Sequence, residues 1–314
     1  MTDTDKTEKA LASRPWKDTT INRLITEAIA IEEESAKKAG ALGYMARAMV
    51  QTTLPHKAVK GQEFTRSNGH FKLTMFAPSH VGLPYGNVPR LLLAWLTTEA
   101  VLKKERTIQL GDNLSGFMRE LGLVPTGGRW GTITRLREQT KRLFGSAISC
   151  TYEGEQQYAS AGFMIADKLS LWWNPQHPEQ STLFGSYVQL SETFFKEVIE
   201  RPVPVDMRAL KALKRSPLAL DIYCWLTYRL SYLNARADIP WPLLQLQFGS
   251  DYANNAEGQR NFKKKFLLQL RKVKVIYREA KIEDGDHALT LFPSKPHIPK
   301  ELVGGRPGRR LYRA

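Results

Sequence analysis

The stretch that decides the fold is Gly127–Phe144, which reads GGRWGTITRLREQTKRLF. A glycine pair opens it, and the residues that follow carry an apolar stripe together with five basic side chains. At about 100° per residue, the apolar side chains share one face of a helix: Ile133, Leu136, Leu143 and Phe144. The pattern predicts a helix that is anchored to its domain by one face and offers positive charge to something outside.

The whole chain is strongly basic. Its 314 residues include 46 lysines and arginines against 31 acids, which gives a net charge of +15 and a pI of about 9.7. Such a charge attracts polyanions, with nucleic acid first and an anionic membrane surface second. No apolar run is long enough to span a membrane, and the first residues, MTDTDKTEKA, lack the plan of a signal peptide. We therefore expect a cytoplasmic protein with no membrane partner.

A plan of elements occurs twice along the chain. In the first copy, Asn87–Lys104 reads as a helix, TIQL as a short strand, and Asp112–Gly122 as a second helix capped by Asp112 or Asn113. The quoted stretch is the third helix. Two β-prone runs, AISCTYEG and YASAGFMIADKLSLWW, follow it as a hairpin or longer wing.

The second copy begins about 130 residues later with the helix Ser216–Leu233, where CWLT matches the AWLT of the first copy. Pro240–Gly249 takes the place of the second helix, and Glu257–Lys274 is a second basic helix before a strand, a DGD turn and a returning strand. A helix, a short strand, two helices and a hairpin describe a winged helix. We therefore predict an α+β, mainly helical chain with two tandem winged-helix domains related by internal duplication.

The expected boundaries follow from these copies and from composition. A helical pattern with an acidic face runs from Asp18 to about Met49, which favours packing on the body or on a partner. The predicted parts are an N-terminal helical extension at 1–65, the first domain at 66–180, the second at 181–296, and a disordered basic tail at 297–314.

Both basic helices are suited to duplex DNA. The major groove admits a helix, where Arg or Lys can bridge guanine and Asn or Gln can pair with adenine, while phosphates supply most of the affinity. In the second helix, Phe262, Phe266, Leu270 and Val273 form the apolar seam. The predicted DNA-binding residues are Arg129, Thr132, Thr134, Arg135, Gln139, Lys141 and Arg142 in the first stretch, and Arg260, Asn261, Lys264, Lys265, Arg271 and Lys272 in the second.

An enzyme is poorly supported. GGRWGTIT lacks the Lys-Ser/Thr ending of a phosphate-binding P-loop, and the six histidines show no metal-ligand spacing. Scattered acids such as Glu99 and Glu120 lie in charge-mixed helices typical of solvated faces. Trp95 and Trp225, at matched apolar positions, are expected in the core. We expect no catalytic residue, no metal site and no cofactor.

The segments YGNVPRLLLAWLTTEA and LGDNLSGFMRELGLVPTGGRWGTITRLREQTKRLF resemble the RepA family of plasmid replication initiators. The resemblance covers roughly residues 78–293. It implies winged-helix domains that bind repeated sites, called iterons, at a plasmid origin, with host initiation proteins and a helicase as partners. A transcription regulator that acts by DNA occupancy alone is the alternative. A homodimer would suit an inverted repeat.

Overall fold

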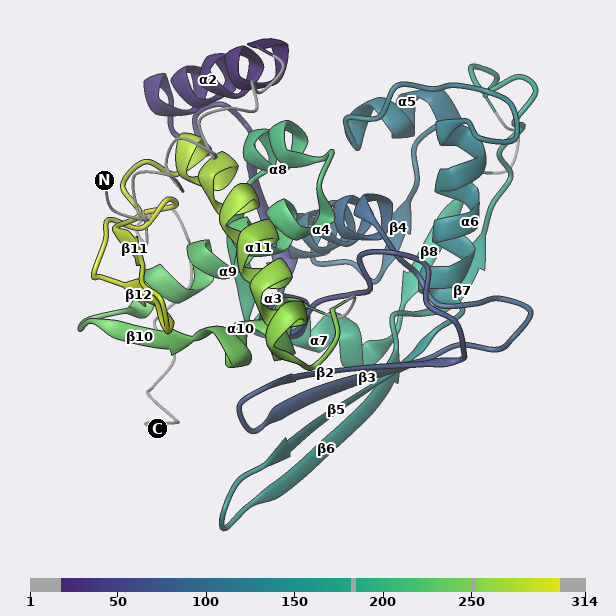
Figure 1. The fold of residues 1–314 in the computed structure, drawn as a ribbon. Coiled ribbons are helices and arrows are strands. Elements are labelled where there is room, and N and C mark those ends of the chain that lie inside the picture. Colours follow the sequence, from purple (N-terminus) through teal and green to yellow (C-terminus); the bar gives the residue numbers. More distant parts are fainter. Residues whose placement is uncertain (1–17, 182–184, 250–251, 300–314) are drawn as a thin grey trace.

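The computed structural model describes residues 18–181, 185–249 and 252–299 (Figure 1). The chain is a mixed α/β structure, with four sheets among these residues. Residues 1–17 and 300–314, which include most of the predicted basic tail, lie outside the described residues.

The first set of elements has the predicted helices and short strand, but one strand of its sheet, at Tyr187–Leu190, lies beyond the predicted wing. It consists of α4 (Asn87–Lys103), β4 (Thr107–Gln109), α5 (Leu114–Glu120), α6 (Thr132–Phe144), β7 (Ala166–Ser170) and β8 (Tyr187–Leu190). Strand β8 lies between β4 and β7 in an antiparallel sheet. Of the two predicted caps of α5, Asn113 is the one whose side chain accepts a hydrogen bond, from the backbone N–H of Gly116.

The second set has the same order and the same strand arrangement. It consists of α9 (Pro217–Tyr232), β10 (Ala237–Pro240), α10 (Trp241–Phe248), α11 (Ala256–Ile276), β11 (Ile282–Asp284) and β12 (Ala288–Leu291). Strand β12 lies between β10 and β11, as β8 lies between β4 and β7. The predicted core tryptophans are buried, and each meets a phenylalanine of the following helix edge-on: Trp95 with Phe117 at 4.9 Å and Trp225 with Phe248 at 5.5 Å between ring centroids.

A long hairpin separates α6 from β7 in the first set. Its strands β5 (Ala147–Glu153) and β6 (Tyr158–Met164) join a second hairpin, β2 (Glu63–Asn68) and β3 (Phe71–Phe76), in the antiparallel order β2-β3-β5-β6. The far end of the β5–β6 hairpin extends from the body (Figure 1). Helix α7 (Glu192–Glu200) packs against β6, and α10 of the second set packs against β2. This sheet, whose strands β5 and β6 lie within the first set, therefore also contacts the second set.

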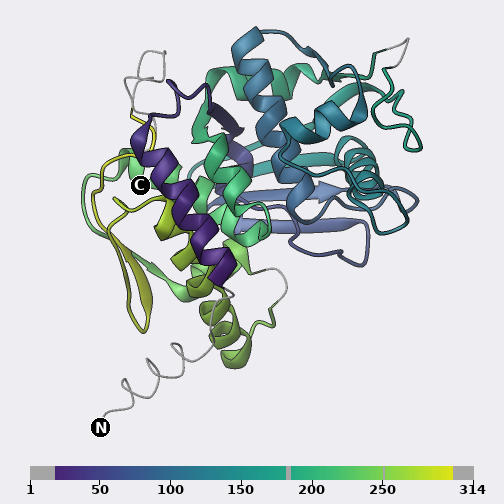
Figure 2. The ribbon, with the colours of Figure 1, turned by 90° about the horizontal axis from the view of Figure 1, so that it is seen from above.

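The N-terminal segment folds onto the second half. Helix α2 (Asp18–Glu33) lies across α11 and α8 (Met207–Leu213) (Figures 1 and 2). Strand β1 (Leu42–Ala46), followed by α3 (Arg47–Gln51), pairs with β9 (Pro202–Asp206).

The prediction of one helical segment from Asp18 to Met49 was wrong between Glu33 and Arg47, where a turn and β1 interrupt it. A separate turn follows the helix and closes at Gly40, which has a positive φ of 62°. At Gly43, which faces Val205 in β9, a Cβ atom would come within 2.5 Å of the Met207 sulfur, so a larger residue there would displace the Met207 side chain.

Two of the predicted boundaries fall inside continuous structure. Residue 181 was the expected start of the second domain, yet β8 beyond it completes the sheet of the first set. The predicted tail begins at His297, but His297 bonds to Tyr223 and Tyr277, and Ile298 is buried. The start of the tail is thus part of the fold.

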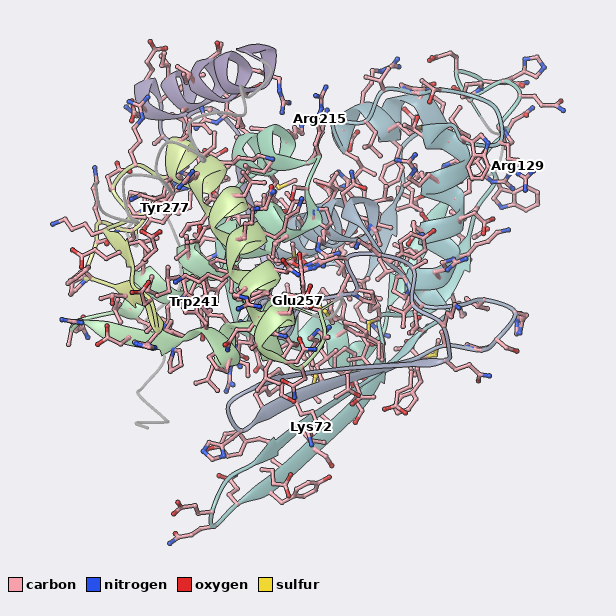
Figure 3. The ribbon with its side chains drawn as sticks, viewed as in Figure 1. Lys72, Arg129, Arg215, Trp241, Glu257 and Tyr277 are labelled. Atoms are coloured by element: carbon pink, nitrogen blue, oxygen red, sulfur yellow. The ribbon has the colours of Figure 1, made fainter. Side chains whose placement is uncertain are left out.

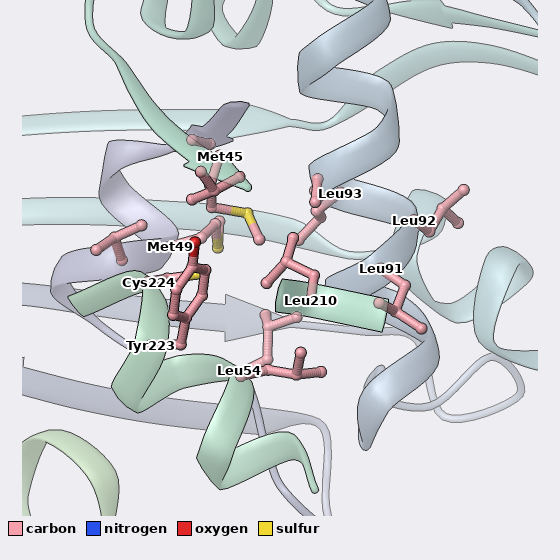
Figure 4. Close-up of a cluster of buried hydrophobic side chains, with 14 of the residues drawn as sticks. Met45, Met49, Leu54, Leu91, Leu92, Leu93, Leu210, Tyr223 and Cys224 are labelled. Atoms are coloured by element: carbon pink, nitrogen blue, oxygen red, sulfur yellow. The ribbon is translucent and has the colours of Figure 1, made fainter. Parts of the chain in front are cut away.

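The two halves meet in a shared core. Side chains from β1, α3, α4, α8 and α9 interlock there, and Figure 4 shows Met45, Met49, Leu93, Leu210 and Cys224 among them. A buried ion cluster lies at its edge.

In this cluster Arg90 of α4 donates from Nε and Nη2 to the two carboxylate oxygens of Asp221 on α9, both at 2.7 Å. The ring Nε2 of His56 also lies 2.7 Å from Asp221. Arg90 further donates to the backbone oxygens of Leu54, Pro55 and Gly86. Burial opposes the charge on Asp221, but Arg90 and His56 outweigh it and hold the pKa of this carboxyl below its usual value.

Candidate nucleic-acid interface

The loop before α6 is fixed by its own threonines. Thr126 and Thr132 exchange hydrogen bonds between backbone N–H and side-chain oxygen, both at 2.9 Å. Thr132 also donates its hydroxyl to the backbone oxygen of Val124. A Cβ atom at Gly131 would lie 2.2 Å from the Thr126 oxygen, so only glycine fits this turn. The first N–H of α6 is therefore bonded by the side chain of Thr126, which lies outside the helix, rather than by the side chain of an N-cap residue.

The two faces of α6 are sorted largely as predicted. Ile133, Leu136, Leu143 and Phe144 are buried against the body, where α6 contacts α4. Thr134, Arg135 and Lys141 are exposed. Thr134 donates its hydroxyl to the Gly128 oxygen at 2.9 Å, so the loop is tied to the exposed face of the helix.

Two predicted contact residues on α6 have a different role. Gln139 is only 3% exposed, and its side-chain oxygen accepts the backbone N–H of Tyr85 at 2.8 Å. Arg142 is half-buried, with its guanidinium 5.3 Å from the Tyr85 ring centroid and one N–H bonded to the Leu83 oxygen. These two side chains hold α6 to the loop before α4. The prediction that Gln139 faces outward was wrong, because its partner in the loop cannot be seen on a helical wheel.

The second basic helix, α11, begins at the cap residue Asn255, whose side chain accepts the backbone N–H of Gly258 at 2.7 Å. Phe262, Phe266, Leu270 and Val273 are buried, as predicted. The exposed predicted contact residues of α11 are Arg260, Asn261, Lys264, Lys265 and Arg271.

Two other lysines of α11 face the body: Lys272, which was predicted to contact DNA, and Lys263, which was not. Lys272 is half-buried and donates to the side-chain oxygen of Gln269, and burial together with nearby Lys265 lowers its pKa. Lys263 lies over the Trp241 ring and donates to the backbone oxygens of Gly285 and Asp286 in the turn between β11 and β12. Lys263 thus secures the hairpin beside α11.

The exposed cations of α6, α11 and the loop before α6 have no carboxylate partner in the part of the chain that the structure describes. Among the described residues, none of the cations at 129, 135, 141, 260, 264, 265 and 271 forms an ion pair with a carboxylate. Their charge is available to an external anion. The same part of the chain holds no group of residues arranged to bind a metal ion and no helix long and apolar enough to cross a membrane.

One exposed residue of this region was given no role by sequence reasoning. Trp130 lies in the loop before α6, beside Arg129, and is exposed to solvent. Its position in GGRWG was visible in the sequence, but a tryptophan in a glycine-rich turn has no periodicity that would assign it to a face.

Comparison with known proteins identifies the family. Residues 83–241, just over half of the chain, match the family model described as plasmid-encoded RepA protein. No curated protein matches. The chain is similar to a crystal structure of domains 2 and 3 of RctB, with 12% identity and a TM-score of 0.46, and to selenomethionine derivatives of these domains, with 10% identity and a TM-score of 0.49. Each comparison covers 77% of this chain and 94% of the other.

Proposed function

Because this chain belongs to the family of plasmid-encoded RepA proteins, we propose that it is a replication initiator that binds repeated duplex DNA sites at a plasmid origin. It acts in the cytoplasm by binding rather than by catalysis. Host initiation proteins and a helicase are its partners in opening the duplex.

One observation carries the DNA-binding part of the proposal. The unpaired cations lie on the exposed faces of α6 and α11 and in the loop before α6. Lys and Arg at such positions neutralise phosphates and release counterions, which supplies most of the affinity for duplex DNA. The guanidinium of Arg135 can bond to both acceptors of a guanine edge, and the amide of Asn261 can pair with an adenine edge.

We further propose that each set of elements is a winged-helix unit and that the two arose by duplication. The shared order of elements, the shared strand arrangement and the matching Trp–Phe pairs support this interpretation. Helices α6 and α11 are then the recognition helices of their units.

The two recognition helices differ in sequence, so one chain carries two unlike reading surfaces. Thr134 and Arg135 lie on one, and Arg260, Asn261 and Lys264 lie on the other. A single chain then covers a non-palindromic site of roughly two helical turns, as direct repeats require.

The test is a plasmid that carries this gene and its flanking DNA, placed in a host without other plasmid initiators. Replication that depends on the gene supports initiation, whereas repression of a reporter without replication favours a regulator. The double variant Arg135→Ala/Lys141→Ala should abolish replication. The matched control is Lys37→Ala/Lys38→Ala, which removes the same charge from exposed residues outside both helices. Equal loss in the two variants would contradict the proposed surface.

A further inference from the structure

The loop before α6 presents an aromatic side chain to solvent. Trp130 is 81% exposed, the largest exposed fraction of any large apolar side chain among the described residues. A single exposed apolar residue is ordinary on a protein surface. The rigidity and the charge of its surroundings make Trp130 different.

The loop is ordered by hydrogen bonds of its own residues. The exchanged hydrogen bonds of Thr126 and Thr132 close it. Gly128 has a φ of 84°, and its carbonyl oxygen accepts hydrogen bonds from the Gly131 N–H and the Thr134 hydroxyl. Because Thr134 belongs to the exposed face of α6, its bond to Gly128 holds the loop on the side of the helix that carries Arg135. These bonds restrict the loop, so less conformational entropy is lost when it contacts a partner.

The charge around Trp130 selects the partner. The chain from Leu121 to Arg137 contains no acid, and Arg129, Arg135 and Arg137 are its charged residues. The Arg129 guanidinium lies 5.1 Å from the Trp130 ring centroid. Figure 3 shows Arg129 at the outer edge of the molecule, beside α6. An aromatic ring with a guanidinium beside it fits duplex DNA, where apolar sugar and base edges lie next to phosphates.

We propose that Trp130 is a DNA contact whose indole packs on the deoxyribose and the thymine methyl group at the edge of the groove that α6 enters, with Arg129 on the neighbouring phosphate. This inference rests on the proposed function, because it requires α6 to lie on duplex DNA. It adds an apolar contact to a surface that is otherwise charged and polar.

The experiment uses the full chain and a duplex selected by that chain from a random-sequence pool. Trp130→Ala should raise the dissociation constant about fivefold, since burying roughly 40 Å² of apolar surface contributes about 1 kcal/mol. The slope of log affinity against log salt should not change, because no phosphate contact is lost. Arg129→Ala should instead reduce that slope by about one.

A second measurement locates the contact. Replacing each thymine of the duplex by deoxyuridine removes one methyl group at a time. One such replacement should weaken the intact chain and leave Trp130→Ala unaffected, while Trp130→Phe retains part of the effect. The control is Trp172→Ala, which removes another tryptophan, 53% exposed, that lies outside the loop.

The outcomes separate the two proposals. If the intact chain shows no salt-dependent binding to any duplex, the proposed function fails and this inference fails with it. If the intact chain binds and Trp130→Ala binds equally well, only the inference is overturned. If Trp130→Ala binds DNA normally but no longer supports plasmid replication, the tryptophan contacts a protein, and the DNA contact is rejected.

Discussion

Replacing Asp221 by asparagine is expected to lower the free energy of unfolding by about 3 kcal/mol. The change keeps the shape of the side chain but removes the negative charge that faces Arg90, whose side chain is 4% exposed. Breaking a buried ion pair typically costs about 3–5 kcal/mol, because the remaining charge is left without compensation. Arg90 keeps its three backbone carbonyl acceptors, which places the loss at the lower end of this range.

The assay is urea unfolding of the intact chain, Asp221→Asn, and the cycle formed by Arg90→Met, Asp221→Leu and the double variant Arg90→Met/Asp221→Leu. The double variant should be less destabilised than either single variant, since it buries no uncompensated charge. The lowered pKa of Asp221 adds a pH signature. Its contribution to stability is complete above pH 3.8, the usual pKa of the group, and is lost as the pH falls through the folded-state pKa.

Two results would refute the reasoning. A loss below about 1 kcal/mol in Asp221→Asn would show that the carbonyls alone satisfy Arg90. A double variant that loses the sum of both single effects would show that each residue acts through packing rather than through the pair.

Four further predictions concern the surface and the core. Arg135→Ala should cost about 1–3 kcal/mol of affinity for the selected site and relax base preference at one position, and equal losses on random DNA would make Arg135 a phosphate contact. The affinity of the intact chain for DNA should fall by about three to five decades between roughly 50 and 200 mM salt. An affinity that hardly changes with salt would show that the basic faces do not contact DNA. Arg142→Ala should lower stability by about 1–2 kcal/mol in urea unfolding with the salt slope of DNA binding unchanged, because its guanidinium holds the loop at Tyr85. Burial lowers the pKa of His297, so its stabilising effect is complete above pH 6.5 and declines as the pH falls through the folded-state pKa; His297→Gln should flatten this part of the pH–stability curve.

Sequence periodicity was sufficient where a helix supplies its own signals. The helix at Asn87–Lys103 and the one at Thr132–Phe144 combine an apolar face with turn residues at their ends, and both are present where they were expected. The strand Leu42–Ala46 was missed because its conformation depends on a partner at Pro202–Asp206. Such pairing leaves no local pattern.

The candidate site shows the same division. Arg135 and Lys141 are exposed as the helical wheel indicates, because the opposite face of α6 is apolar. Gln139 and Arg142 are bound by the loop at Leu83 and Tyr85, which a wheel does not contain. A helical wheel predicts the direction in which a side chain points. Whether another part of the chain covers that side chain depends on the tertiary fold, which the wheel does not contain.

The docking of α2 on α11 has a consequence for synthesis on the ribosome. The contact joins a helix that ends at Glu33 to one that begins at Ala256. At about 5–20 residues per second, the first helix waits roughly 10–50 seconds before its partner is made. During that interval its apolar side chains Leu24, Ala28 and Ile31, which the finished fold buries, have no permanent cover. We therefore expect the nascent chain to bind chaperones that recognise exposed apolar helices until the last quarter of the chain, which contains α11, has been made.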